Sequence, residues 1–214
     1  MSVLNRPMVW AYIGASGSGK GVSINKALAS LKPARLLIWD PRDEYGKHAK
    51  RVTTLPALVA EFRKASAGPV RVRYVAGSGM PLADAFALVC SLAFEVGHLV
   101  FLAEELSDVT TASQAPAAWR RCITQGRHRA LHIIGAAQRP ALIDKTFLGN
   151  CTFIRCFTLR YSDDRSAMAK ALDVPLADVS ALQTVETEKA TTIAYLERDF
   201  RAGVLQKGSI RMSR

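Results

Sequence analysis

A glycine-rich loop near the amino terminus limits what this chain can fold into more than any other feature. Seven consecutive residues follow the pattern GxxxxGK, a Walker A motif: Gly14, Ala15, Ser16, Gly17, Ser18, Gly19 and Lys20. The apolar run at 8–13 predicts a buried strand before the loop, and apolar residues at helical spacing in 20–31 predict a helix after it. Glycines let such a loop wrap a phosphate with its N–H groups pointing inward, while the helix N-terminus and the lysine add positive charge. We therefore expect this loop to bind ATP.

The residue after the lysine is unusual. A serine or threonine usually stands there and its hydroxyl ligates Mg²⁺, but this chain has Gly21 followed by Val22, and we include both among the nucleotide-contacting residues. Small-molecule kinases of the adenylate type also carry glycine there, although a hydroxyl residue follows it. In this chain Ser23 comes one place later. Either Mg²⁺ is held by the triphosphate, water and acidic residues, or a nearby serine substitutes.

A second apolar run, at 99–103, ends in two acidic residues and has the form of a Walker B strand. In P-loop ATPases such a strand places one acid near Mg²⁺ and the next near the attacking water. We assign Glu104 to the metal and Glu105 as the catalytic base. A pair of acids after a strand can also be a solvated turn, so the assignment depends on the phosphate loop.

Apolar runs and amphipathic segments alternate along the rest of the chain. Further strands are expected at 35–39, 70–75 (at or near a sheet edge), 131–136 and 153–159, and in the tail at 191–205 around 198–200. Helices are expected at 55–67, 82–96, 116–125 and 163–172. Strands that alternate with helices predict an α/β fold of three layers with a mostly parallel central sheet. We expect one domain over 1–214, with a core at about 8–172 and C-terminal strands at about 189–206.

Composition excludes several protein classes. Hydrophobic residues make up 49% and charged residues 22%, which is ordinary for a globular protein and unlike a disordered one. The longest apolar run, at 85–94, is too short to span a bilayer, and the N-terminus lacks the pattern of a signal peptide. A soluble, cytoplasmic protein is therefore expected. The four cysteines form no CxxC pair, so buried free thiols are expected rather than zinc ligands or disulfides.

Positive charge predicts a polyanionic partner. The 29 basic residues exceed the 18 acidic ones by 11, and the excess is uneven. Between 115 and 160, eight Lys or Arg residues stand against one acid, Asp144, which leaves +7. Nucleic acid is the natural partner of such a surface, and a merely solvated basic surface is the alternative.

The order of these motifs resembles one family. The segments GASGSGKGVSIN, LLIWDP, LVFLAEELSD and RCITQGRHRALHIIGAAQRP are similar to those of the FtsK/HerA superfamily of DNA-pumping ATPases. The last segment is the most specific, because in that family a helix carrying arginine leads into a strand that ends in glutamine, often as Gln-Arg-Pro, here Gln138-Arg139-Pro140. The resemblance covers about 8–172. Gly21 and Glu104, where aspartate is commoner, depart from the family pattern.

The resemblance implies a RecA-like core, a homo-oligomeric ring (a hexamer) and ATP sites between subunits. Gln138 would sense the γ-phosphate or orient the water. An arginine finger from the neighbouring subunit would complete the site; Arg127 is our first choice and Arg121 the second, and a DNA-phosphate contact is the alternative for either. Asp40 would match the family's aspartate after the second strand, or would cap a loop.

The small size narrows the resemblance to the genome-packaging ATPases of tailless, membrane-containing viruses. Such a protein would translocate double-stranded DNA, work in the host cytoplasm or at a virion vertex, and meet capsid portal or membrane packaging proteins. Basic loops would line the pore of the ring, because phosphate contacts bind the backbone without reading sequence. Candidate DNA-facing positions are Arg42, Lys47, Lys50, Arg51 and the segment 77–79.

Other functions stay open at this point. Within the same class, a conjugative or plasmid DNA-transfer ATPase, or an ATPase that extrudes filamentous phage, carries the same motifs. A small-molecule kinase is suggested by Gly-Lys-Gly and predicts a phosphoryl acceptor and indifference to DNA. A nucleotide-binding assembly factor that does not hydrolyse ATP is the third class, with Gly21 as its mark.

Overall fold

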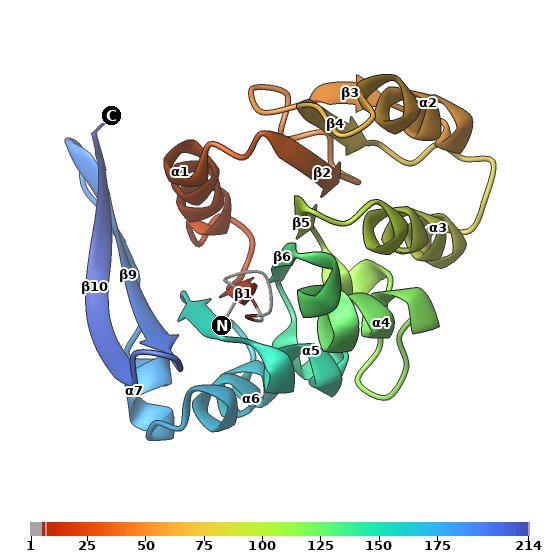
Figure 1. The fold of residues 1–214 in the computed structure, drawn as a ribbon. Coiled ribbons are helices and arrows are strands. Elements are labelled where there is room, and N and C mark those ends of the chain that lie inside the picture. The colour runs from red at the N-terminus through yellow and green to blue at the C-terminus, as the bar shows by residue number, and fades with distance from the viewer. Residues whose placement is uncertain (1–5, 7, 214) are drawn as a thin grey trace.

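The computed structural model describes residue 6 and residues 8–213 (Figure 1). One sheet runs through the described chain in the order β10-β9-β7-β1-β6-β5-β2-β4-β3, and β8 pairs with β9. The strands are β1 (Met8–Ile13), β2 (Arg35–Trp39), β3 (Lys50–Val52), β4 (Val70–Tyr74), β5 (Leu99–Ala103), β6 (Leu131–Ala137), β7 (Phe153–Cys156), β8 (Thr184–Glu186), β9 (Ala190–Asp199) and β10 (Val204–Ser213). The strands from β7 to β3 in this order are parallel, whereas β8, β9 and β10 pair antiparallel.

Helices cover both faces of the sheet, so the fold has the three layers that the sequence predicts. The helices are α1 (Lys20–Leu31), α2 (Leu55–Ala65), α3 (Leu82–Val96), α4 (Ala117–Gln125), α5 (Lys145–Asn150), α6 (Ser162–Leu172) and α7 (Leu176–Ser180). Helix α1 lies on one face and is flanked by the β9–β10 hairpin, while α2 to α6 gather on the other (Figure 1). None of the helices in this part of the chain is both long and apolar enough to cross a membrane.

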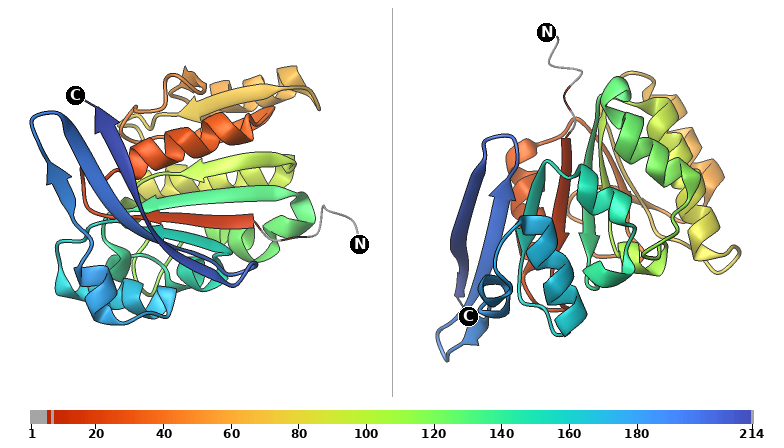
Figure 2. Two further views of the ribbon diagram at one scale, coloured as in Figure 1. Left: turned by 90° about the vertical axis from the view of Figure 1, so that its left-hand side faces the viewer. Right: turned by 90° about the horizontal axis from the view of Figure 1, so that it is seen from below.

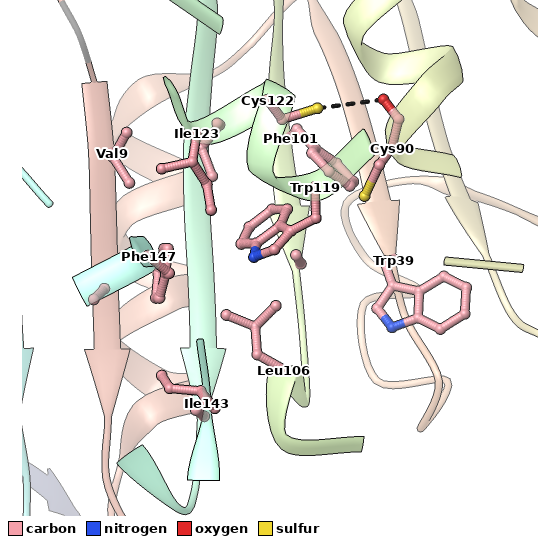
Figure 3. Close-up of a cluster of buried hydrophobic side chains, with 14 of the residues drawn as sticks. Val9, Trp39, Cys90, Phe101, Leu106, Trp119, Cys122, Ile123, Ile143 and Phe147 are labelled. Atoms are coloured by element: carbon pink, nitrogen blue, oxygen red, sulfur yellow. Dashed lines mark hydrogen bonds between the residues drawn. The ribbon is translucent and has the colours of Figure 1, made fainter. Parts of the chain in front are cut away.

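The larger hydrophobic core fills the space between the sheet and α2 to α7. Trp119 of α4 is fully buried and contacts the ring of Phe86. It also contacts the rings of Phe101 and Phe147 (Figure 3). The four cysteines are buried free thiols, as expected, and the Cys122 Sγ lies 3.3 Å from the carbonyl oxygen of Cys90. A second, smaller core lies beneath α1, where Ile24 and Leu28 pack with Ile193 of β9.

Most predicted elements are present, and the differences have local causes. The run at 153–159 forms a strand only to Cys156, although Phe157 and Leu159 stay buried after it. The C-terminal hairpin turns at 200–203 rather than at 198–200. Gly203, at the end of this turn, has a φ of 68°. The second strand of the hairpin continues to Ser213, so residues 206–213 are part of the sheet and the prediction that the strands end near 206 was wrong. The short elements β3, α5, α7 and β8 were not predicted.

Candidate functional site

The predicted site residues meet where the parallel strands end, because parallel strands bring their carboxyl ends to one edge of a sheet. We call this the carboxyl edge, and the opposite one, where the same strands begin, the amino edge (Figure 2, left). The carboxyl edge holds a cleft of about 240 Å³. Its lining residues come from the phosphate loop, the loops after β2, β5 and β6, and the C-terminal hairpin: Ser16, Gly17, Ser18, Gly19, Lys20, Gly21, Val22, Glu44, Glu104, Glu105, Gln138, Ile193 and Met212.

The backbone of the phosphate loop has the shape that an anion requires. Gly17 and Gly19 have φ values of 74° and 96°, in the left-handed region that glycine enters without strain. Gly19 also leads directly into the N-terminus of α1, which has no side-chain cap. The first N–H groups of α1 have no acceptor within the helix, and a phosphate group can accept hydrogen bonds from them.

Two side chains of the loop, a hydroxyl without a partner and a buried ammonium, are also suited to a phosphate. The Ser18 hydroxyl is buried and has no hydrogen-bond partner within the described chain. The Lys20 ammonium is buried and donates to the carbonyl oxygens of Gly14 (2.7 Å) and Ala15 (3.2 Å). Burial lowers the pKa of Lys20, while Glu104 and Glu105 oppose that shift. The residues present therefore fit a bound triphosphate.

The position after the lysine remains without a hydroxyl. Gly21 borders the cleft, and a Cβ added to it would meet no atom within 4 Å. Ser23 does not replace it, because its Oγ accepts from Arg155 Nη1 at 3.2 Å and Ser23 is not among the residues that line the cleft. Among the described residues there is no group of three His, Cys, Asp or Glu side chains that could hold a metal ion. Any Mg²⁺ would therefore need oxygen atoms from the nucleotide and water.

The two acids after β5 stand at the cleft in different settings. Glu104 is buried, its Oε1 accepts from the hydroxyl of Tyr45, and burial raises the pKa of Glu104 to about 7. Glu105 has a left-handed backbone with a φ of 49°, which is uncommon for a side chain of this size. Its Oε1 accepts from Gln138 Nε2 at 2.5 Å. The cleft therefore holds a carboxylate and an amide that are joined by a hydrogen bond beside the phosphate loop.

Three residues at the cleft were missed from the sequence. Glu44 comes from the loop after β2, and Ile193 and Met212 come from the hairpin more than 170 residues after the loop they cover. Ile193 contacts the phosphate loop so closely that a Cβ on Gly19 would lie 2.8 Å from its Cδ1. No motif marks these positions, because they reach the cleft only through the packing of the hairpin.

Asp40 acts as a loop cap in this structure. Its two carboxylate oxygens accept from the backbone N–H groups of Glu44 (2.9 Å) and Tyr45 (3.1 Å), and Arg73 donates to it at 2.9 Å. Asp40 does not line the phosphate cleft. Of the two roles considered for Asp40, the geometry therefore favours the cap.

Both candidate finger arginines lie at the amino edge, away from the cleft of their own chain. Arg121 forms an exposed ion pair with Glu95 at 3.3 Å, and its guanidinium lies 3.9 Å from the centre of the Phe94 ring. Arg127 lies in the turn before β6, and within the described chain its recorded side-chain contact is with His128, at 3.3 Å. Neither arginine therefore lines the cleft of its own chain.

The basic segment at 115–160 presents less unpaired positive charge than the sequence suggests, because several of its arginines form ion pairs. Four of its arginines form ion pairs with Asp144, Glu95, Asp164 and Glu197, and three of these acids lie outside the segment: the pairs are Arg120–Asp144, Arg121–Glu95, Arg139–Asp164 and Arg155–Glu197. The candidate DNA-facing residues are exposed, but three of them are also paired: Arg42 with Asp108, Lys50 with Glu61 and Arg51 with Asp43. Lys47 has no ion pair recorded within the described chain and borders a groove along α1.

Known proteins are similar to this chain, one in sequence and others in structure. Protein P9 of Pseudoalteromonas phage PM2 is 29% identical over 177 residues, which cover 81% of this chain and 78% of that protein. The genome packaging NTPase B204 from Sulfolobus turreted icosahedral virus 2, in complex with ATP-gammaS, superposes with a TM-score of 0.69 at 16% identity, covering 94% of this chain and 96% of that one. VirB4 of Thermoanaerobacter pseudethanolicus gives a TM-score of 0.58 at 12% identity, covering 100% and 91%.

No protein-family model matches the chain. The structural similarities confirm the RecA-like P-loop fold, and at the level of the fold they confirm the resemblance expected from the sequence.

Proposed function

We propose that this chain hydrolyses ATP and uses the energy to move double-stranded DNA, as the packaging motor of a viral genome. The observation that carries the proposal is the meeting of Lys20, Glu105 and Gln138 in one cleft, with a hydrogen bond that joins the last two. A phosphate-binding lysine, a base and a sensor of the γ-phosphate are the parts that ATP hydrolysis requires. The shared fold with a genome packaging NTPase supports the choice of DNA as the substrate of the motor.

The chain's own residues divide the work of hydrolysis. Lys20 and the inward N–H groups of the loop bind and orient the phosphates, and Gln138 orients the attacking water. Glu105 Oε2 or Oε1 accepts the proton of that water. Glu104 would hold Mg²⁺ together with nucleotide oxygens and water, and the metal would neutralise charge on the transferred phosphoryl group. Ile193 and Met212 line the same cleft, where they would exclude bulk water from the loop.

A ring of identical subunits is part of the proposal. Arg127 and Arg121 lie at the amino edge, so an arginine finger from this chain would act on the nucleotide of a neighbouring subunit. A hexamer would enclose DNA, and the net charge of +11 favours contact with the phosphate backbone. Capsid portal or membrane packaging proteins would then anchor the ring, in the host cytoplasm or at a virion vertex.

The test is the rate of phosphate release per subunit as protein concentration rises, with and without double-stranded DNA. We expect the rate to climb steeply with concentration, to rise with DNA, and to vanish in Lys20→Ala. A rate that is independent of concentration and of DNA would contradict the motor and direct attention to a phosphoryl acceptor, as a small-molecule kinase requires. Nucleotide binding with no phosphate release at any concentration would instead indicate an assembly factor.

A DNA-transfer ATPase is the second candidate, because VirB4 has the same fold over the whole of this chain. Both candidates pump DNA, so the cleft does not separate them. Packaging predicts that antibodies against this chain detect it in assembled virions or empty capsids of the virus that encodes it. Detection only in a mating-pair complex would favour DNA transfer.

A further inference from the structure

The loop at 40–49, between β2 and β3, is fixed to the site more firmly than an ordinary connection. At its start, Asp40 accepts two backbone N–H groups of the loop and is itself held by Arg73. Asp40 is only 1% exposed, so these bonds are shielded from water. Buried hydrogen bonds to a charged group are among the stronger ones in proteins. The position of the residues that follow Asp40 is therefore well defined.

The far end of the loop is fixed to the helix that follows the phosphate loop. His48 Nε2 lies 2.6 Å from Asn25 Oδ1, and Asn25 Nδ2 donates to the carbonyl oxygen of Gly21 at 2.7 Å. The loop therefore docks on the turn of α1 that carries the unusual glycine. Because both ends are held, the residues between them have a fixed relation to the cleft.

This arrangement of the loop places the side chain of Tyr45 beside Glu104. The Tyr45 side chain is 1% exposed, and its hydroxyl donates to Glu104 Oε1. Among the described residues, this is the hydrogen bond recorded for the Glu104 carboxylate. A buried carboxylate with a single donor is costly for the fold, so its retention at this point is best explained by a role in the site. With Oε1 occupied by Tyr45, Oε2 is the oxygen left for a ligand in the cleft.

We propose that Tyr45 is a positioning residue that orients Glu104 toward Mg²⁺, and that it compensates for the hydroxyl missing at position 21. The inference rests on the proposed function, since it concerns the metal of the nucleotide site. It follows from geometry: Gly21 offers no ligand, and Ser23 is bound to Arg155. Of the two buried acids at the cleft, Glu104 is the one that Tyr45 holds, whereas Glu105 accepts from Gln138. A carboxylate that is held in one rotamer loses less conformational freedom when it binds a metal.

The test measures binding of a fluorescent ATP analogue against Mg²⁺ concentration, and again in EDTA. We expect Tyr45→Phe to raise the Mg²⁺ concentration needed for half-maximal tight binding by ~10-fold or more, the usual effect of removing a partner of a metal ligand. Binding in EDTA should not change, because the phosphate loop is intact. Tyr74→Phe is the matched control, since Tyr74 is also buried, lies on the adjacent β4 and has no recorded hydrogen bond from its hydroxyl within the described chain.

Gly21→Thr supplies the second variant. The open space at Gly21 admits the side chain, so this change alone should lower the Mg²⁺ requirement, and in the Tyr45→Phe background it should recover most of the loss. A gain from Gly21→Thr that is larger in the Tyr45→Phe background than in the wild type would be non-additive and would show that the two positions serve one metal. An unfolding temperature close to that of the wild type would exclude a purely structural effect of Tyr45→Phe.

Four results would overturn the inference. An unchanged Mg²⁺ requirement in Tyr45→Phe, or an equal loss in EDTA, would refute the role of Tyr45 while leaving the proposed function intact. Failure of Gly21→Thr to lower the requirement in either background would refute the compensation. Absence of any Mg²⁺-dependent binding by the wild type would refute the proposed function as well, so the two failures are distinguishable.

Discussion

The two edges of the sheet hold their charged side chains in opposite ways. At the carboxyl edge, Lys20, Glu104 and Glu105 are 8%, 6% and 8% exposed, and burial shifts the pKa of Lys20 down and that of Glu104 up to about 7. At the amino edge, Arg121 and Arg127 are exposed, and the guanidinium of Arg121 lies over the ring of Phe94. One edge therefore keeps charge out of water, and the other presents charge to it.

Under the proposed function, this difference separates the edge that binds the nucleotide from a surface that would act on another molecule. Burying charge costs stability unless partners are present, so a protein retains it where a ligand will supply them. Exposed arginines carry no such cost and can serve a neighbouring subunit or a DNA backbone. The predictions below test whether the edges differ in this way.

Arg127→Ala should have the largest effect if the amino edge serves a neighbour's cleft. Loss of an arginine finger lowers the hydrolysis rate by ~10³- to 10⁵-fold. Nucleotide binding should be almost unchanged, because Arg127 is remote from its own cleft. The measurement is ATP hydrolysis by the assembled ring, beside equilibrium binding of an ATP analogue.

Mixing two inactive variants provides the decisive control for Arg127. Arg127→Ala keeps an intact phosphate loop, and Lys20→Ala keeps an intact finger, so mixed rings contain some complete sites. Activity that returns on mixing supports action between subunits. Mixtures as inactive as either variant alone would contradict the assignment of the amino edge.

Glu105→Gln should have the next largest effect and tests the carboxyl edge by itself. Removal of a general base costs ~10²- to 10⁴-fold in rate. The amide keeps an oxygen that can accept from Gln138, so the cleft should keep its shape and still bind ATP. Single-turnover hydrolysis and ATP binding are measured together. A rate within a few fold of the wild type would show that Glu105 is not the base.

The sequence predicted the carboxyl edge in much greater detail than its surroundings. Each of the predicted site residues follows a strand whose apolar run can be recognised in the sequence: the phosphate loop, Glu104, Glu105 and Gln138. Parallel strands bring the residues at their carboxyl ends together. Tyr45, Ile193 and Met212 could not be predicted, since each reaches the cleft through long-range packing. The strand β3 was missed because it has only three residues and its side chains at 50 and 51 are exposed.

Charge could be counted from the sequence but not located. The excess between 115 and 160 is reduced by acids from distant segments, among them Glu197, which pairs with Arg155 across 42 residues. Pairing of this kind depends on sheet order, because β7 lies beside β9. A local sum of charges therefore overstated the basic surface of this segment.

A third prediction concerns stability at the amino edge. His132, the second residue of β6, is 7% exposed, and its Nε2 has no hydrogen-bond partner within the described chain. Burial is the main cause that lowers the pKa of His132 from 6.5 to about 4, and the positive charge of Arg201 lowers the pKa further. A lowered pKa gives stability that is complete above pH 6.5 and is lost as the pH falls toward 4. The difference of roughly 2.5 pH units corresponds to about 3 kcal/mol.

Urea unfolding of the wild type and His132→Phe at pH 7 and pH 4.5 measures this contribution. The variant should lose less stability on acidification than the wild type, because it has no imidazole to protonate. His98→Gln is the matched control, since His98 is an exposed histidine of the same edge. Equal losses in wild type and His132→Phe would assign acid sensitivity to other groups.

Arg121→Ala should have the smallest effect and separates the two arginines of the amino edge. Its ion pair with Glu95 is exposed and its guanidinium lies over Phe94, so its removal should lower the free energy of unfolding by about 1 kcal/mol or less. Hydrolysis should stay near the wild-type rate, because the guanidinium is already engaged within its own chain. Arg121→Lys keeps the charge and loses the flat stacking surface, and it should behave like the alanine variant. Arg121→Ala could instead abolish hydrolysis, with activity returning when the variant is mixed with Lys20→Ala. That result would make Arg121 the finger, and its contact with Phe94 would then have to open when the ring assembles.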